Sequence, residues 1–478
     1  MLKLFLLLCA LFVGQSLFAQ QGVHQQSTTY EWPSDPQVKQ KLDKWQDQKF
    51  GMIIHWGLYA VAGSIESWEL CSEDWIERDS TIAYEDFKKS YWGLSKKFNP
   101  VKFNPEQWAQ AGKDAGMKYL VFTTKHHDGF CMFNTKETDF NIAQGPFKDN
   151  PRADVAKYVF DAFRKQGFMI GAYFSKPDWH SQYYWWSKYA TPDRNNNYDI
   201  KKHPWRWNQY KQYTYNQISE LMHNYGSVDI LWLDGGWVRP LETVNEEVRS
   251  WGAAIPAWSQ DIDMPKIAAM ARTAQPGLLM VDRTVHGPYE NYQTPEQKIP
   301  DHQLDHPWES CMTLGNAWGF VPGDTYKSTS KVVHSLIEIV AKGGSLLLGL
   351  GPKPDGTMPA EAVSRLEDIG KWTSLNGKAI YNTRITPEFQ NGNTWFTQSK
   401  DGKTKYSLVT ISESGSFSDL VNWKGNSPAK GSKMTLLQTG KTVRWSQKGD
   451  LTEVVLPKGL EKSGAKCPAL AFSYIAER

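Results

Sequence analysis

The sequence predicts an α/β protein in which a (β/α)8-like barrel of the TIM type is followed by a small C-terminal antiparallel β-sandwich. Three observations lead to this prediction. Short apolar runs of strand length alternate with segments of helical periodicity, which is typical of βαβ units in a parallel sheet. The runs end on polar, aromatic or glycine-rich clusters, at the position where barrel enzymes place their chemistry. Near residue 385 this plan stops, and short alternating runs replace it.

The predicted barrel strands are apolar runs that a parallel sheet would bury on both faces. The most informative run ends on Asp234, and two glycines follow that carboxylate at once. Other runs end in comparable clusters, such as His55-Trp56-Gly57 and Lys125-His126-His127-Asp128-Gly129. The six predicted strands cover residues 50–54, 119–124, 169–175, 228–233, 278–281 and 345–350.

Five helices are predicted from the near-helical spacing of apolar residues and from a glycine at each C-terminal end. They cover residues 105–116, 154–167, 208–226, 264–277 and 329–343. Six strands and five helices favour an eightfold barrel in which two strands are not assigned. A doubly wound open sheet is the alternative. Because candidate functional groups are spread over the ends of all these strands, the closed barrel is preferred.

The length of 478 residues leaves room for a second module beside a barrel. We expect the barrel to occupy residues 20–384 and the sandwich to occupy residues 385–478, where turn signals separate short alternating runs. Residues 1–19 have the features of a cleavable export signal: one basic residue, an apolar stretch and a small residue, Ala19, before the cleavage point. The protein is therefore expected to be periplasmic or secreted.

Composition and charge argue against several kinds of partner. The formal net charge is +3, and it falls to +2 without residues 1–19 because Lys3 is the only charged residue there. A surface this close to neutral argues against nucleic acid or anionic lipid. No apolar run is long enough to span a membrane. The remaining cysteines form no Cys-x-x-Cys pair, so neither a zinc site nor a disulfide framework is indicated.

The local sequence leaves two roles open for Asp234, which could carry chemistry at a barrel mouth or could cap a helix or open a turn. The aromatic content gives a second indication, because the chain has 22 Trp and 21 Tyr, many of them in predicted loops such as 179–186 and 204–207. An exposed Trp is costly unless something stacks on it, and the apolar face of a sugar is a suitable partner. Most of these aromatic residues are nevertheless expected to clamp loops onto the barrel.

These motifs, in this order, resemble those of family 29 of the glycoside hydrolases, the retaining α-L-fucosidases. The resemblance runs through essentially the whole predicted barrel, and no single motif would be sufficient. It rests on His55-Trp56-Gly57, Thr124-Lys125-His126-His127-Asp128-Gly129-Phe130, Leu231-Trp232-Leu233-Asp234, Asp282-Arg283 with Thr294-Pro295-Glu296, Pro307-Trp308-Glu309 and Trp318-Gly319.

The resemblance implies two catalytic carboxylates. Retaining hydrolysis needs an ionised carboxylate that attacks the anomeric carbon and a protonated one that gives its proton to the leaving oxygen. Asp234 matches the position of the nucleophile, and Glu296 matches that of the general acid/base. Glu290 is the alternative acid/base, because this position shifts between subgroups of the family. Glu309 is expected to be a structural carboxylate.

The resemblance also implies a set of substrate-binding residues around fucose, which carries a methyl group where galactose carries a hydroxymethyl group. Trp232 and Trp318 would supply an apolar patch for this methyl group. The family's Glu-Trp pair has its nearest equivalent in Glu66-Ser67-Trp68, and the serine inserted between the two departs from the family pattern. The complete expected set is His55, Glu66, Trp68, His126, His127, Tyr173, Trp232, Arg283 and Trp318.

The histidines allow a second interpretation, because imidazole is a common zinc ligand. Adjacent residues on a strand point to opposite faces, so His126 and His127 would chelate one ion only if the strand had already ended. We therefore expect these two residues and His55 to hydrogen-bond to sugar hydroxyls. Neither a metal nor another cofactor is expected.

Taken with the resemblance, the sequence predicts an exported, exo-acting α-L-fucosidase that removes terminal α-linked L-fucose from a fucosylated oligosaccharide or glycoconjugate with retention. Two alternatives stay open. One is a barrel glycosidase for another sugar, and the other is a non-catalytic glycan-binding protein. A metal-dependent hydrolase is a more distant third.

Overall fold

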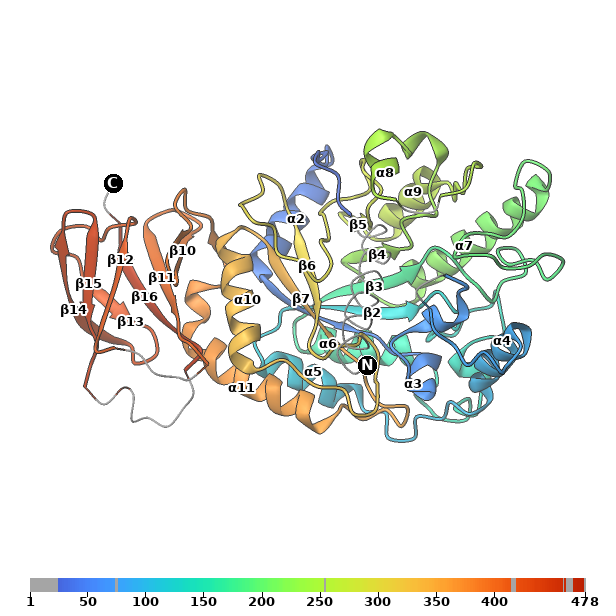
Figure 1. Ribbon diagram of the computed structural model, residues 1–478, viewed down its shortest axis with the longest axis horizontal. Coiled ribbons are helices and arrows are strands. Elements are labelled where there is room, and N and C mark those ends of the chain that lie inside the picture. Colours follow the sequence, from blue (N-terminus) through green and yellow to red (C-terminus); the bar gives the residue numbers. More distant parts are fainter. Residues whose placement is uncertain are drawn as a thin grey trace, which may run out of the picture.

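A parallel sheet and an antiparallel sheet occupy opposite ends of the molecule, and α10 (Thr329–Ala341) and α11 (Ala360–Asn376) lie between them (Figure 1). The computed structural model describes residues 25–73, 76–252, 255–413, 418–458, 460 and 467–476. The expected export signal, residues 1–19, lies outside the described residues. In the described part of the chain, no helix combines the length and the apolar character needed to cross a membrane.

The parallel sheet has seven strands in the order β5-β4-β3-β2-β1-β7-β6, and every neighbouring pair is parallel. All but β6 are buried along their whole length, as expected for strands covered on both faces. The predicted barrel-type α/β fold is therefore confirmed. The strands are β1 (Phe50–Ile54), β2 (Tyr119–Lys125), β3 (Met169–Ser175), β4 (Ile230–Asp234), β5 (Leu279–Asp282), β6 (Glu309–Thr313) and β7 (Ser345–Leu350).

An irregular segment, residues 290–297, connects the two edge strands of this sheet and is called the bridging segment below. It forms isolated bridges from Glu290 to Val281 of β5 and from Glu296 to Cys311 of β6. Among the residues described, the sheet thus has seven regular strands and not eight, and the bridging segment makes isolated bridges to both edge strands. Strand β6 was not predicted because Glu-Ser-Cys-Met-Thr contains no apolar run.

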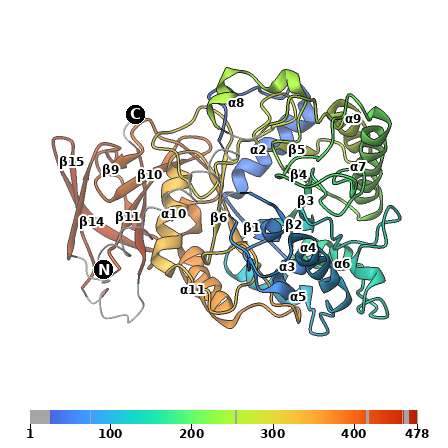
Figure 2. The ribbon, with the colours of Figure 1, turned by 45° about the vertical axis from the view of Figure 1, so that its right-hand side comes forward.

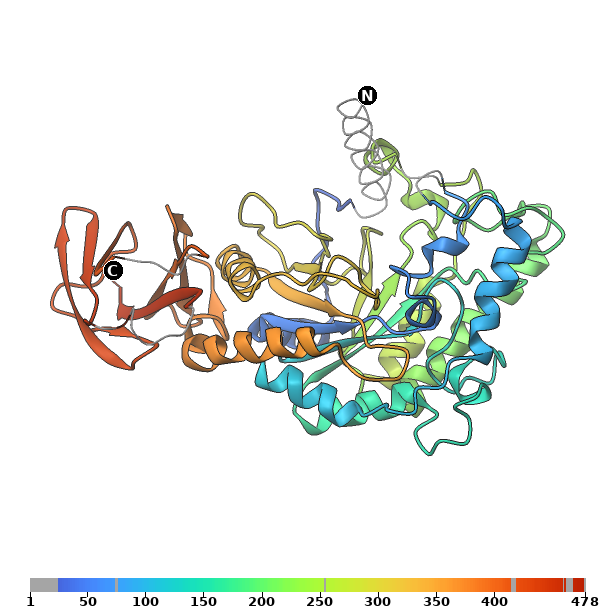
Figure 3. The same ribbon diagram turned by 60° about the horizontal axis from the view of Figure 1, so that its bottom comes forward.

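Helices surround the parallel sheet in the turned views of the molecule (Figures 2 and 3). The five predicted helices correspond to α5, α6, α7, α9 and α10. Helix α2 was missed, although its buried Val38, Leu42 and Trp45 are spaced along one helical face and the Asp35 side chain caps its first turn. Besides α10 and α11, the helices are α2 (Pro36–Gln48), α3 (Leu58–Ala62), α4 (Tyr84–Trp92), α5 (Pro105–Asp114), α6 (Val155–Lys165), α7 (Pro204–Asn224), α8 (Glu246–Ser250) and α9 (Met264–Ala274).

The antiparallel sheet forms the predicted C-terminal sandwich and begins immediately before residue 385. Its strands follow the order β12-β15-β14-β13-β16-β11-β10-β8, and β9 pairs with β10. They enclose one apolar core, in which Trp423 of β12 contacts Phe472 of β16 with ring centroids 5.7 Å apart. The strands are β8 (Thr383–Arg384), β9 (Gln390–Asn391), β10 (Thr394–Ser399), β11 (Thr404–Thr410), β12 (Leu420–Lys424), β13 (Met434–Leu436), β14 (Lys441–Lys448), β15 (Leu451–Val455) and β16 (Ala469–Ile475).

Specific polar contacts fasten the sandwich to the rest of the molecule. The indole of Trp372 in α11 donates a hydrogen bond to the carbonyl of Ala469 at 2.8 Å. Arg384 of β8 forms ion pairs with Asp43 and Asp47 of α2 at 2.7 and 2.6 Å. The sandwich therefore contacts the barrel through the helices next to it.

Candidate active site

A cavity opens where the carboxyl ends of the parallel strands meet. Ten of the eleven site residues expected from the sequence line it. Ile53, which was not predicted, completes the lining as an inward-facing residue of β1. The lining residues are Ile53, His55, Glu66, Trp68, His127, Tyr173, Trp232, Asp234, Arg283, Glu296 and Trp318.

Asp234 is the last residue of β4, and its carboxylate is held from several directions. Oδ2 accepts a hydrogen bond from the Tyr173 hydroxyl at 2.7 Å, and Oδ1 accepts from the backbone N–H of Gly235 at 2.8 Å. The Arg283 Nη1 also donates to Oδ1 at 2.8 Å, and the Nε2 of His127 lies 3.8 Å from Oδ2. These contacts orient an acidic group whose side chain is 11% exposed toward the cavity.

The two glycines after Asp234 are required by their surroundings. Gly235 has φ of +89°, in the region that favours glycine, and a Cβ there would collide with the ring of Pro177. A Cβ on Gly236 would collide with the side chain of Thr284. The turn after the nucleophile candidate therefore packs tightly against neighbouring loops.

Glu296 comes from the bridging segment and faces the same cavity. Its Oε2 accepts from Arg283 Nη2 at 2.8 Å, and its Oε1 accepts from the indole of Trp318 at 3.3 Å. Pairing of the bridging segment with β6 places this residue, since the backbone N–H of Gln297 donates to Cys311 O at 2.9 Å.

Arg283 joins the two candidate catalytic carboxylates through a single guanidinium. Nη1 contacts Asp234, Nη2 contacts Glu296, and Nε donates to the Thr294 hydroxyl at 3.0 Å. The guanidinium also lies over the Trp232 ring, 4.4 Å from its centroid. Because this planar group donates in fixed directions, it sets the relative placement of the two carboxylates.

Glu290, the alternative acid/base, does not belong to the cavity lining. Its Oε1 accepts from the backbone N–H of Thr284 at 3.0 Å, and its side chain is buried beneath the loop after β5. Burial raises the pKa of Glu290 to about 8. The structure therefore brings Glu296, and not Glu290, to the same cavity as Asp234.

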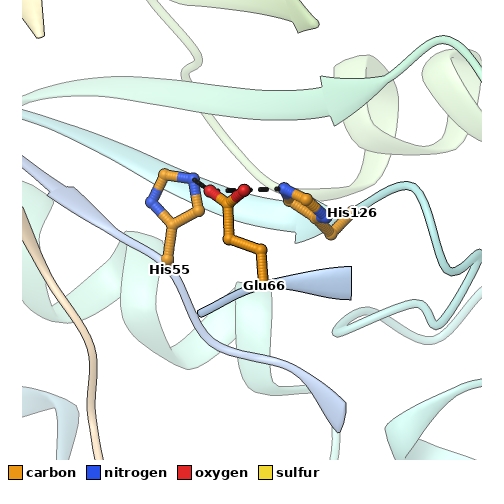
Figure 4. Close-up of side chains that lie close together, drawn as sticks. All are labelled: His55, Glu66 and His126. Atoms are coloured by element: carbon orange, nitrogen blue, oxygen red, sulfur yellow. Dashed lines mark ion pairs between the residues drawn. The ribbon is translucent and has the colours of Figure 1, made fainter. Parts of the chain in front are cut away.

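A cluster of three polar side chains lies at one side of the cavity, and His55 and His126 both point toward the carboxylate of Glu66 (Figure 4). The Oε1 of Glu66 lies 3.7 Å from His55 Nε2 and 3.9 Å from His126 Nε2. Burial lowers the pKa of His126 to about 4 and that of His55 well below its usual range. Burial, together with the nearby Glu296 and Asp234, raises the pKa of Glu66 well above its usual range. The lowered pKa values favour neutral imidazoles and the raised pKa favours the protonated form of Glu66, which suits the binding of neutral sugar hydroxyls.

The inserted serine of the Glu66-Ser67-Trp68 motif contacts His126. Its hydroxyl lies 2.5 Å from Nδ1 of His126, while Glu66 on one side and Trp68 on the other both reach the cavity. His126 is the one expected site residue that is absent from the lining, and it supports Glu66 from behind.

Strand β2 ends at Lys125, so His126 and His127 follow the strand and do not alternate across it. Their ring centroids are 4.3 Å apart. Two groups of potential metal ligands result, each with ligand atoms within 4.8 Å of one another: His55 with Glu66 and His126, and His126 with His127 and Asp234. The condition for both imidazoles to face one ion, a strand that has already ended, is therefore met.

Aromatic residues outside the expected set support the site. The Trp237 ring lies 5.2 Å from His127 and 5.6 Å from Trp68, measured between centroids. The Arg194 guanidinium lies 5.1 Å from the Trp68 ring and 5.4 Å from the Trp237 ring. The position of Trp237 directly after the Asp-Gly-Gly turn was the available sequence signal, whereas Arg194 comes from a distant loop that no motif marks.

Glu309, expected to be a structural carboxylate, lies at the start of β6 and is fully buried. It accepts hydrogen bonds from the Tyr119 hydroxyl at 2.6 Å and from the Trp232 indole at 3.2 Å. The ring of Tyr173 stacks on Trp232, with centroids 5.2 Å apart. Through these contacts Glu309 holds the aromatic floor of the cavity.

Comparison with known proteins gives a consistent result. Residues 17–378 match the family model described as Alpha-L-fucosidase. The tissue alpha-L-fucosidase of Rattus norvegicus is 27% identical over 449 residues, which cover 89% of this chain and 87% of that protein. The plasma alpha-L-fucosidase of Homo sapiens is 27% identical over 386 residues, covering 77% of this chain and 76% of that protein. The structure of alpha-L-fucosidase isoenzyme 1 from Paenibacillus thiaminolyticus superposes with a TM-score of 0.74 at 27% identity, covering 92% of this chain and 100% of that one.

Proposed function

We propose, since the chain belongs to the α-L-fucosidase family, that it is an exo-acting glycoside hydrolase that removes terminal α-linked L-fucose from glycans with retention at the anomeric carbon. The observation that carries the proposal is the pair of carboxylates joined by Arg283 across one cavity. Asp234 belongs to β4 and Glu296 to the bridging segment, and both side chains line that cavity.

The two carboxylates divide the work of a double displacement. Asp234 attacks the anomeric carbon and forms a fucosyl-enzyme ester, while Glu296 gives its proton to the leaving oxygen. Water then enters, Glu296 takes one of its protons, and the oxygen of that water displaces Asp234 from the anomeric carbon. The hydrogen bonds from Tyr173 and Gly235 hold the nucleophile in one orientation, which lowers the entropic cost of the attack.

Recognition of fucose uses the two kinds of wall that the cavity offers. The polar side chains of His55, Glu66 and His127 bind hydroxyls, with His126 behind Glu66, whereas Trp318 and Trp232 face the methyl group. A cavity whose two carboxylates are only 10% and 11% exposed encloses one terminal sugar better than the middle of a chain. This enclosure supports exo-action on fucosylated oligosaccharides or glycoconjugates.

We also propose that the protein is exported and that its chain is divided into a signal peptide, a catalytic domain and a C-terminal sandwich. Residues 1–19 are a signal peptide that directs the protein to the periplasm or the medium, residues 20–384 form the catalytic domain, and residues 385–478 form a sandwich that braces it. N-terminal sequencing of the exported protein should begin at Gln20. A start at Met1 in a cytoplasmic fraction would contradict this part.

The decisive experiment is turnover of an aryl α-L-fucoside by wild type and by Asp234→Ala. The variant should lose on the order of 10³-fold or more in kcat/KM, because no carboxylate remains to attack. Azide should restore turnover with a β-fucosyl azide as product, since a small anion can enter the vacated space from the nucleophile's face. Wild-type turnover without any effect of Asp234→Ala would contradict the assignment.

The assignment of the acid/base is tested by Glu296→Gln with Glu290→Gln as the matched control. Glu296→Gln should lose activity mainly on fucosides with poor leaving groups, and azide should give an α-fucosyl azide. Glu290→Gln should keep activity on both kinds of fucoside. The reverse result would transfer the role to Glu290.

A panel of nitrophenyl glycosides separates the remaining possibilities. A preference for a galactoside over the fucoside would favour a barrel glycosidase for another sugar. Binding of fucose without turnover of any glycoside, unaffected by Asp234→Ala, would favour a non-catalytic glycan-binding protein.

A further inference from the structure

The backbone before α2 lies against the bridging segment, far away in sequence. We call residues 26–30 the N-terminal strap. The side-chain amide of Gln26 contacts both backbone polar groups of Thr294, which is 268 residues away: Oε1 accepts from the N–H at 3.0 Å, and Nε2 donates to the carbonyl at 3.4 Å. Gln26 thus provides hydrogen-bond partners for the backbone N–H and carbonyl of Thr294, which in a regular sheet would bond to a neighbouring strand.

Two more side chains join the same pair of segments. The Tyr30 hydroxyl donates to the carbonyl of Asn291 at 2.7 Å. The Gln293 amide donates in the opposite direction, to the carbonyls of Ser27 at 2.8 Å and Thr29 at 3.2 Å. Hydrogen bonds therefore cross between the strap and the bridging segment at three successive places.

The strap is also fixed on its other side. The hydroxyl of Ser27 and the backbone N–H of Thr28 each donate to the Glu247 carboxylate of α8 at 2.8 Å. The Tyr30 ring stacks on His306 with centroids 4.9 Å apart and planes 9° from parallel. The strap therefore has anchors of its own and can restrain the bridging segment.

A short path leads from the strap to the catalytic carboxylates. Thr294, whose backbone is held by Gln26, accepts a hydrogen bond through its hydroxyl from Arg283 Nε at 3.0 Å. The same guanidinium contacts Asp234 and Glu296. Thr294 is fully buried and lies two residues before Glu296 in the bridging segment.

We propose that the N-terminal strap is a positioning element for the general acid/base, acting through Thr294 and the backbone of the bridging segment. This inference rests on the proposed function. The bridging segment is irregular, so the bonds to β6 on one side and to the strap on the other fix where the Glu296 carboxyl points. Proton transfer requires hydrogen-bond reach of the leaving oxygen, and a displacement of about 1 Å can reduce the rate by about 100-fold.

The test uses the full chain with Gln26→Ala and, separately, Tyr30→Phe, which keeps the ring that stacks on His306. The readout is kcat/KM on phenyl α-L-fucoside, whose leaving group needs protonation, and on 2,4-dinitrophenyl α-L-fucoside, whose leaving group does not. Each variant should lose on the order of tenfold on the phenyl fucoside and less than about twofold on the dinitrophenyl fucoside.

The C-terminal half of the chain offers a matched control for each variant. Gln438 also makes two contacts with a backbone, donating to Ala469 O at 2.8 Å and accepting from Ala471 N–H at 3.2 Å. The Tyr381 hydroxyl donates to Gly116 O at 2.7 Å, as Tyr30 does to Asn291. Gln438→Ala and Tyr381→Phe should leave the ratio of the two rates at the wild-type value.

An unchanged ratio in folded Gln26→Ala and Tyr30→Phe would overturn the role of the strap. Equal losses on both fucosides would also overturn it, because they would indicate a general loss of structure and not a displaced acid. A wild-type chain that turned over neither fucoside would instead overturn the proposed function, so the two failures are distinguishable.

Discussion

Arg283 donates a hydrogen bond of 2.8 Å to Asp234, and the other terminal nitrogen of its guanidinium donates one of equal length to Glu296. The residue thus connects the end of β4 to the bridging segment. Its position over the Trp232 ring adds the aromatic floor to the same arrangement.

Replacing Arg283 with lysine should reduce kcat/KM on aryl fucosides by about 100-fold, because an ammonium group has no planar fork that can hold two carboxylates in register. Steady-state kinetics on the purified variant would measure this. Arg384, which spans Asp43 and Asp47 at the domain junction, provides the control. Arg384→Lys should keep wild-type kinetics, and an equally active Arg283→Lys would contradict the role given to Arg283.

Ser67→Ala removes the hydroxyl next to Nδ1 of His126 and should weaken fucose binding through the support of Glu66. A lost buried hydrogen bond of about 1 kcal/mol corresponds to a roughly fivefold higher inhibition constant for free fucose. Competition kinetics would measure that constant. Ser407→Ala deletes a comparable buried hydroxyl, 2.8 Å from the Tyr474 hydroxyl in the sandwich, and should have no effect on it. Equal effects of the two changes would contradict the assignment.

Glu290 should make the protein less stable as the pH rises. Its pKa is about 8 when folded against a usual value of 4.5, so between these values the folded state holds a proton that the unfolded state has released. The contribution of Glu290 to stability is therefore complete below pH 4.5 and is lost as the pH rises through about 8.

Melting temperatures of wild type and Glu290→Gln, measured from pH 4.5 to 8.5, would check this, because glutamine cannot ionise. The variant should gain stability relative to wild type across this window by a few degrees. Melting curves that stay parallel over the whole range would show that Glu290 has the same pKa in both states.

Zn²⁺ should inhibit the enzyme in competition with fucose, because both groups of potential metal ligands contain side chains that line the cavity. Mg²⁺, which prefers oxygen ligands, should not inhibit at the same concentration. EDTA should leave kcat/KM unchanged and should reverse the inhibition by Zn²⁺. Loss of activity in EDTA that added metal restores would instead support a metal-dependent hydrolase.

The sequence by itself was sufficient for those parts of the fold that depend on local patterns. Apolar runs buried on both faces predicted six of the seven parallel strands, and all five predicted helices are present. Local patterns did not predict a strand where buried residues are polar. Strand β6 carries Glu309 in a fully buried position, where its carboxyl group accepts hydrogen bonds from the hydroxyl of Tyr119 and the indole of Trp232.

Part of the site could also be expected from local patterns, because parallel strands bring their carboxyl ends to one mouth, where His55, His127 and Asp234 meet. The other members, among them Glu66, Glu296 and Trp318, were expected from the resemblance to the fucosidases. Only the tertiary structure showed which of the candidate residues face the cavity. Glu290 and Glu296 lie in the same segment after β5, yet one is buried behind the loop and the other faces the cavity, because Glu290 bridges to β5 and Glu296 bridges to β6. Such pairings, like that of Gln26 with Thr294 across 268 residues, depend on contacts between distant segments and leave no local pattern in the chain.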